Sequence, residues 1–160
     1  MYGKSGQAVQ VSSNNDVALA EGVPGATTFL LGDCRTPANT IPEALRPSCV
    51  SLMVANRSDW YVRHSHGNVV VDSEYATKTK LPNHLPNFEI DSSFILYSDT
   101  FYPNCYALEA VNFRLSYITS SGDGSLVLND LVDIAGPEET ASFRVVDYNT
   151  SSKLYCFLSL

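Results

Sequence analysis

The chain has 160 residues, 44% of them hydrophobic and 17% charged, so it is long enough for one domain with a real core and is neither a disordered chain nor a coiled coil. Its net charge is −7, and its ten Lys and Arg residues are scattered singly, which argues against nucleic acid as a partner. No apolar run approaches the roughly 20 residues of a membrane span.

Short strands separated by turn clusters account for most of the chain, and no long amphipathic helix is predicted. Residues 17–21 suit either a strand or a helical turn. Residues 32–48 hold three prolines and are typical of a loop, with one helical turn from Pro42, and residues 75–87 are a polar loop. The strands are expected at residues 7–11, 27–31, 49–54, both arms of 60–72, 88–90, 93–97, 105–111, 115–119, 126–128, 142–146 and 153–160.

The stretch from Trp60 to Asp72 is the most informative part of the chain. It predicts a strand, a tight turn and a second strand, because Gly67-Asn68 is a hairpin-turn pair between two runs rich in Tyr, Trp and Val.

The same order of elements recurs along the chain, and each copy has a phenylalanine after two small residues, at Phe29, Phe94 and Phe143. In each copy this phenylalanine is preceded by three elements, which are, in chain order, a strand near a cysteine, a tyrosine-led strand and an apolar triplet. These repeats predict a β-trefoil, an all-β fold of three four-strand repeats in which a closed six-stranded barrel is capped by three hairpins. The single domain 1–160 would contain the units 49–97, 105–146, and one split between the termini as 2–31 plus 153–160.

The middle copy resembles the arabinose-binding domain of the arabinofuranosidase B type (AbfB), a β-trefoil sugar-binding module. The resemblance rests on four motifs: Ser51-Leu52, Tyr61-Val62-Arg63-His64, Gly67-Asn68-Val69-Val70-Val71 and Asp91-Ser92-Ser93-Phe94. The third copy lacks the arginine and histidine after its tyrosine, and Thr140 stands where Asp91 would be. The first copy matches less well still. The resemblance therefore implies one sugar site, in the middle copy.

Sugar recognition needs paired polar groups for hydroxyls and an aromatic face for the apolar side of the ring. The residues expected to supply them are Trp60, Tyr61, Arg63, His64 and Asp91. A purely structural arrangement also fits, in which Arg63 and Asp91 form an ordinary ion pair and His64 bonds to the backbone.

Metal binding and catalysis are weaker interpretations. His64 and His66 could share one face of a strand, with His84 or Glu74 as a third ligand, but a turn at Ser65–Asn68 would splay the pair. We therefore expect no metal and no cofactor. Asp72, Glu74, Glu89 and Asp91 are close enough in sequence for a glycosidase pair, yet such carboxylates are more often solvated, and no nucleophile motif accompanies them. We expect no enzyme.

Four cysteines, an even number without a zinc-like spacing, favour an oxidising compartment and allow three pairings. We expect Cys34–Cys49 and Cys105–Cys156. Asn56 and Asn149 begin N-glycosylation triplets, which also favours secretion.

Two functions compete at this point. The first is a non-catalytic carbohydrate-binding module of an extracellular protein, with an arabinose-like sugar or another plant or microbial glycan as its ligand. The alternative is a structural or assembly subunit. It is motivated by the apolar last strand, residues 153–160, which could insert into a neighbouring copy and build an oligomer or filament.

Overall fold

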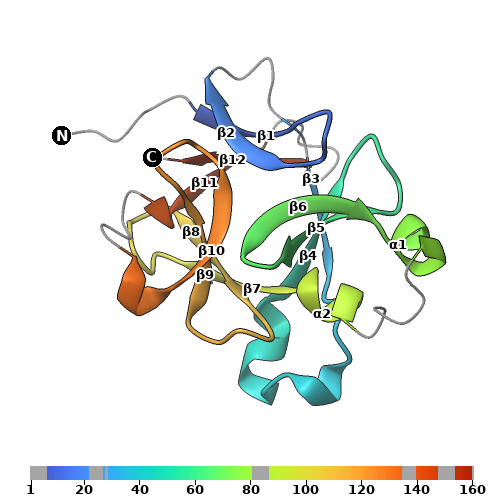
Figure 1. Ribbon diagram of the computed structural model, residues 1–160. Helices are drawn as coiled ribbons and strands as arrows, with labels where there is room; N and C mark the ends of the chain where they lie inside the picture. Colours follow the sequence, from blue (N-terminus) through green and yellow to red (C-terminus); the bar gives the residue numbers. More distant parts are fainter. Residues whose placement is uncertain are drawn as a thin grey trace.

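The computed structural model describes residues 7–21, 27, 29–80, 87–134, 140–147 and 154–159. Over these residues the protein consists of strands with short helical segments between them (Figure 1), so the all-β prediction is confirmed. No described helix is long and apolar enough to cross a membrane.

The strands match the predicted positions closely, and residues 17–21 form a strand rather than a helical turn. The strands are β1 Gln7–Val11, β2 Val17–Glu21, β3 Phe29–Asp33, β4 Cys49–Val54, β5 Trp60–Ser65, β6 Asn68–Ser73, β7 Phe94–Ser98, β8 Tyr106–Ala110, β9 Ser116–Ser120, β10 Leu126–Asp130, β11 Phe143–Asp147 and β12 Leu154–Ser159. The helices are α1 Glu74–Lys80 and α2 Phe88–Asp91, with 3-10 turns η2 Ala38–Thr40, η3 Glu43–Ser48 and η5 Leu131–Asp133.

A closed antiparallel barrel is the centre of the molecule. Strand β3 pairs with β4, β4 with β7, β7 with β8, β8 with β11, β11 with β12, and β12 returns to β3. The remaining strands join the same sheet as the pairs β1–β2, β5–β6 and β9–β10. Closure leaves the barrel strands with neighbours on both sides and therefore without a free edge.

The predicted β-trefoil of three four-strand repeats, one of them split between the termini, is wrong. The strands form a closed barrel with additional strands, and they do not follow the predicted units. Strand β2, which the repeat alignment left out, pairs with β1 along its whole length, and residues 74–80 and 88–91 of the middle unit are helical. The alignment matched apolar triplets without allowing for the turn after β1. The predicted strand at Tyr2 lies outside the described residues.

The side chains that point into the barrel form the main hydrophobic core. Phe29, Phe94 and Phe143, the phenylalanines that recur in the sequence, are each at most 1% exposed, and Val71 is fully buried. Truncating a buried phenylalanine typically costs about 3–5 kcal/mol, so these residues are principal determinants of the fold.

The turn between β5 and β6 lies one residue earlier than predicted. Ser65 pairs with Asn68, so the two loop residues are His66 and Gly67, and Asn68 already belongs to β6. Both loop residues have positive φ, 52° and 84°, as a type I′ turn requires. The glycine was correctly identified as a turn residue, but histidine occupies the position expected of an asparagine or aspartate.

Two predicted segments are helical instead. The polar loop 75–87 begins with α1, whose first turn is capped by Ser73, since its Oγ accepts a hydrogen bond from Ala76 N at 3.1 Å. The predicted strand 88–90 is α2, a single turn after which the Ser92 and Ser93 hydroxyls donate back to the carbonyls of Phe88 and Glu89. The helical turn expected after Pro42 is present as η3, with Pro42 at its N-cap.

The last strand, β12, pairs inside its own chain with β11, β1 and β3. In the described structure it therefore completes the barrel of its own chain. Self-association of the chain stays a prediction.

Candidate functional site

One cavity of about 580 Å³ opens where β5, α2 and the connection after β8 meet. Hereafter it is called the pocket. Its walls are polar side chains and two phenylalanines from four separate segments: β5 with its turn, α1, α2 with the residue before it, and the connection after β8. They are Arg63, His64, Ser65, His66, Thr77, Asn87, Phe88, Asp91, Asn112 and Phe113. Three of the five predicted sugar-binding residues, Arg63, His64 and Asp91, thus lie together.

His64 is the most deeply buried polar residue of the pocket, at 4% exposure. Its Nε2 lies 2.8 Å from Asn112 Oδ1 and 3.4 Å from Asp91 Oδ1, and its ring meets Phe113 edge-on at 5.2 Å between centroids. With its hydrogen on Nε2, the ring donates to Asn112. The Nε2 atom of the imidazole therefore contacts side chains of the pocket. The purely structural arrangement had predicted a hydrogen bond to the backbone instead.

Asp91, the last residue of α2, uses its two oxygens differently. Oδ1 accepts a hydrogen bond from Asn112 Nδ2 at 2.8 Å. Among the described residues, Oδ2 has a charged neighbour in Arg63, whose Nη1 lies 4.0 Å away. A carboxylate oxygen can accept about two hydrogen bonds. Oδ2 therefore keeps acceptor capacity, on a residue that lines the pocket.

Arg63 is held mainly by a neighbour on the paired strand. Its Nε and Nη2 lie 2.7 and 2.6 Å from Asp72 Oδ2, and its Nη1 donates to the His64 carbonyl at 3.3 Å. Asp72 is two residues beyond Val70, which pairs with Arg63, so this is a diagonal cross-strand pair. The predicted Arg63–Asp91 pair exists only as the longer 4.0 Å contact, whereas the short ion pair of Arg63 is with Asp72.

Trp60 and Tyr61 lie outside the pocket. Arg57 covers the Trp60 ring at 4.4 Å, and Arg35 covers the Tyr61 ring at 3.9 Å. Tyr61 meets Phe88 edge-on at 6.4 Å, so it supports the pocket from behind through that ring. Both residues sit at the end of β5 that is farther from the hairpin turn.

Asn112 and Phe113 are pocket residues that the sequence analysis missed. They follow β8, in the short connection to β9, and Phe113 is 54% exposed. Their signal is weak: an amide and an aromatic side chain between two strands, where loops often carry binding residues. Phe113 supplies the exposed aromatic face that was expected from Trp60 or Tyr61.

The predicted metal alternative finds no supporting cluster among the described residues. His64 is buried, whereas His66, in the turn, is exposed and has its Nδ1 near Ser65 Oγ. The turn therefore separates the two histidines. Glu74 forms an ion pair with Arg35 at 2.5 Å, and His84 lies outside the described residues.

A fully buried carboxylate lies near the end of β8, next to the same β8–β9 connection. Glu109 is fully buried, and its Oε1 accepts from Arg114 Nε at 2.7 Å and from Leu115 N at 2.6 Å. Its Oε2 accepts from the Tyr97 hydroxyl at 2.7 Å. Burial and then the hydrogen bond to Glu109 raise the pKa of Tyr97 to about 12. We call these four residues the Glu109 cluster.

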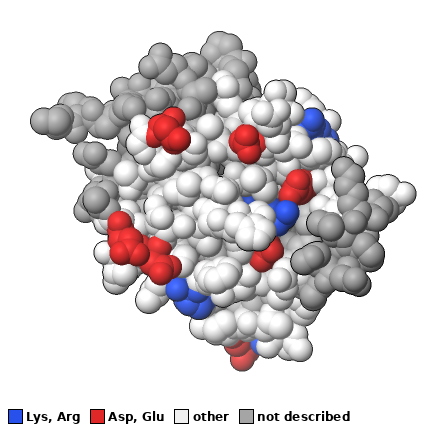
Figure 2. Space-filling model, in the orientation of Figure 1, with Lys and Arg blue, Asp and Glu red and all other residues white. Residues whose placement is uncertain are grey.

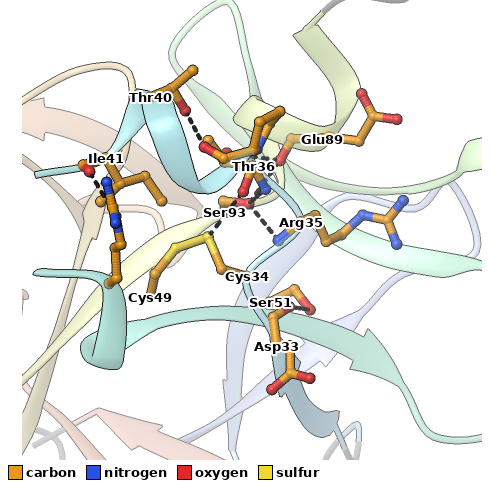
Figure 3. The surroundings of a disulfide bond; sticks show 12 residues. Asp33, Cys34, Arg35, Thr36, Thr40, Ile41, Cys49, Ser51, Glu89 and Ser93 are labelled. Atoms are coloured by element: carbon orange, nitrogen blue, oxygen red, sulfur yellow. Dashed lines mark hydrogen bonds between the residues drawn. A yellow bond between two sulfur atoms is a disulfide. The ribbon is translucent and has the colours of Figure 1, made fainter. Parts of the chain in front are cut away.

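The disulfide Cys34–Cys49 is present as predicted and ties the segment after β3 to the start of β4 (Figure 3). Cys105 is buried at 2% exposure, but the Cys156 side chain is outside the described part of the chain, so their bridge stays a prediction. Asn56 is exposed in the turn after β4, and Asn149 lies outside the described residues.

No protein-family model matches the sequence, and a search of curated proteins found no match either. Two similar solved structures are of a GH54 α-L-arabinofuranosidase, one a mutant soaked with 4-nitrophenyl α-L-arabinofuranoside and one soaked with a cyclic sulfate inhibitor. Each has a TM-score of 0.45 and 15% identity, and covers 74% of this chain but 19% of the enzyme chain. These neighbours are carbohydrate-related, and the chain spans about a fifth of their length. The AbfB-type resemblance of residues 51–94 stays a prediction.

Proposed function

We propose that this chain is a non-catalytic carbohydrate-binding module and that the pocket is its ligand site. The observation that carries the proposal is the constellation of Asp91, His64 and Asn112 beside the exposed ring of Phe113, all lining one cavity. The ligand class is an arabinose-like sugar or another plant or microbial glycan.

The pocket offers what a sugar ring requires. Asp91 Oδ2 can accept from a ligand hydroxyl, and Thr77, Asn87 and Ser65 supply further polar groups around it. Phe113 presents an apolar face against which the carbon side of a ring can pack. A cavity of about 580 Å³ falls within the usual size of small-molecule sites.

The acidic residues support binding rather than catalysis. Glycoside hydrolysis uses two carboxyl groups flanking the scissile bond. Of the described residues that line the pocket, Asp91 is the only acidic one. Asp72 is engaged by Arg63, and Glu74 is engaged by Arg35.

Charge and covalent features fit a secreted, glycosylated protein, which is part of the proposal. The Cys34–Cys49 disulfide is compatible with an oxidising compartment, and Asn56 is exposed for modification. Figure 2 shows charged side chains in small scattered groups on this face, without a basic patch that would suit a polyanion.

A glycan array of plant and microbial oligosaccharides tests the proposal. We expect selective binding by the native chain and its loss in Asp91→Ala. Asp133→Ala removes the same charge at an exposed position in η5 and is expected to bind as the native chain does. Flat binding to every glycan, together with oligomers that grow with protein concentration, would instead favour an assembly subunit.

A further inference from the structure

The segment that follows Cys34 is joined to the end of α2 mainly through the buried hydroxyl of Ser93 (Figure 3). The backbone N–H groups of Arg35 and Thr36 both donate to Ser93 Oγ, at 3.1 and 3.0 Å. The same hydroxyl donates to the Glu89 carbonyl at 2.7 Å. A serine hydroxyl has one donor and two acceptor positions, so Ser93, which is fully buried, uses all of them.

The backbone of Ser93 is also hydrogen-bonded to the chain neighbours of two pocket residues, Asp91 and Asn112. Ser93 stands two residues after Asp91, and its N–H donates to the Ile90 carbonyl at 3.2 Å inside α2. Its carbonyl accepts from Val111 N at 3.3 Å, and Val111 immediately precedes Asn112. Ser93 itself does not line the pocket. It is hydrogen-bonded to the residues next to both partners of the Asp91–Asn112 hydrogen bond.

The other side of this connection is anchored covalently. Cys34 is bonded to Cys49 at the start of β4, which fixes the segment 34–36 against the barrel. Thr36 Oγ1 adds a second, longer bond to the Glu89 carbonyl, at 3.4 Å. The single turn of α2 therefore takes its position from the disulfide segment as well as from its own short backbone.

We propose that Ser93 is a positioning residue of the pocket, and that its hydroxyl holds α2 so that Asp91 meets His64 and Asn112. The proposal rests on the proposed function for its effect on ligand affinity. Removing the hydroxyl leaves two buried N–H groups without their acceptor, and such groups draw the backbone towards other partners. Binding sites depend on their geometry being held within about 0.5 Å, so a small displacement of α2 is enough to weaken binding.

The test compares Ser93→Ala with Ser51→Ala. Ser51 is 3% exposed, and its hydroxyl donates to the Asp33 carbonyl at 2.9 Å, on the barrel side of the same segment and away from α2. Each variant loses one buried serine hydroxyl. NMR of the His64 ring and of the Asn112 side-chain amide reports pocket geometry without a ligand, and calorimetry with methyl α-L-arabinofuranoside, or the best glycan on the array, reports affinity.

In Ser93→Ala we expect the His64 and Asn112 resonances to shift and the affinity to fall about tenfold. Ser51→Ala should leave both unchanged at a comparable melting temperature. Shifted resonances in a protein that binds no glycan would sustain the positioning role and remove the proposed function. Unshifted resonances in Ser93→Ala, or equal shifts in both variants, would overturn the positioning role.

A second variant keeps the proposal testable if Ser93→Ala does not fold. Thr36→Val removes only the longer bond to the Glu89 carbonyl and preserves the side-chain shape. We expect smaller shifts of the same two resonances in the same direction. Resonances identical to those of the native chain in Thr36→Val would contradict the proposal.

Discussion

The connection between β8 and β9 takes part in two clusters of polar groups, which differ in whether the carboxylate has a free acceptor position. In the Glu109 cluster both carboxylate oxygens are bonded, to Arg114, Leu115 and Tyr97. In the pocket, Asp91 has one oxygen bonded to Asn112, while Oδ2 has only a 4.0 Å contact with Arg63. The first cluster is closed within the protein, and the second has an acceptor left for a ligand.

This difference separates a structural charge from a binding group. A buried charge whose partners are all internal can hold a loop but has nothing to offer a ligand. Glu109 holds Leu115, which has a positive φ of 66°, at the end of the connection that carries Asn112 and Phe113 over the pocket. The Glu109 cluster therefore positions the connection that carries Asn112 and Phe113, two residues that line the pocket.

Disrupting the Glu109 cluster should have the largest effect on stability. Glu109→Ala leaves the Tyr97 hydroxyl, the Arg114 guanidinium and a backbone N–H without their acceptor, and it opens a cavity. We expect a loss of about 3 kcal/mol in the free energy of unfolding, measured by urea denaturation. The matched variant Glu89→Ala, at a partly exposed position, should lose clearly less. A loss below about 1 kcal/mol in Glu109→Ala would mean that the cluster does not hold the fold.

Substituting Asp91 in the pocket should lower the affinity for the glycan more than it lowers stability. Asp91→Asn keeps the shape of the side chain but turns one acceptor into a donor. We expect at least about a tenfold loss of affinity for the glycan identified on the array, about 1.4 kcal/mol, with a change of unfolding free energy below about 1 kcal/mol. A large stability loss with unchanged affinity would place Asp91 with Glu109 as a structural charge.

Phe113 tests the aromatic part of the pocket at a smaller scale. Because it is 54% exposed, Phe113→Ala should change the unfolding free energy by no more than about 0.5 kcal/mol. Affinity should fall several-fold as the apolar platform is lost. Tyr75→Ala, which removes an aromatic ring that is 73% exposed and lies outside the pocket lining, is the control and should bind normally.

The titration of Tyr97 has no effect near neutral pH and acts only at high pH, where it reports on the Glu109 cluster. Its pKa of about 12 in the folded protein lies above the value of about 10 in an unfolded chain. The folded state then holds the proton more tightly, so this contribution to stability is complete below pH 10 and is lost as pH rises towards 12. Tyr97→Phe should flatten that decline, measured by urea denaturation across the range. An unchanged slope would show that folding does not raise the pKa of Tyr97.

Strand positions could be read from the sequence because alternation and turn residues mark them directly. The Arg63–His64–Asp91 group was also predicted, although its stated aromatic partners, Trp60 and Tyr61, lie elsewhere. Asn112 comes from a different hairpin, so only strand pairing brings it to His64. The helices α1 and α2 were missed because their caps, Ser73 and Ser92, resemble ordinary turn residues in a polar stretch.

The trefoil prediction failed because it, too, depended on strand pairing, which the sequence pattern does not determine. Short apolar triplets are alike in any all-β chain, so aligning them does not fix which strands pair. The position of the turn after β1 decides that β1 pairs with β2, and the alignment gave this turn no weight. Register in sheets depends on turn geometry as much as on hydrophobic pattern.

The most direct test of the account is an NMR titration with the oligosaccharides of the array, following the His64 ring and the Asn112 side-chain amide. The account predicts saturable shifts of both groups with a selected glycan, and their disappearance in Asp91→Asn. Glycan binding that leaves both groups unmoved, or that survives Asp91→Asn unchanged, would contradict the assignment of this pocket.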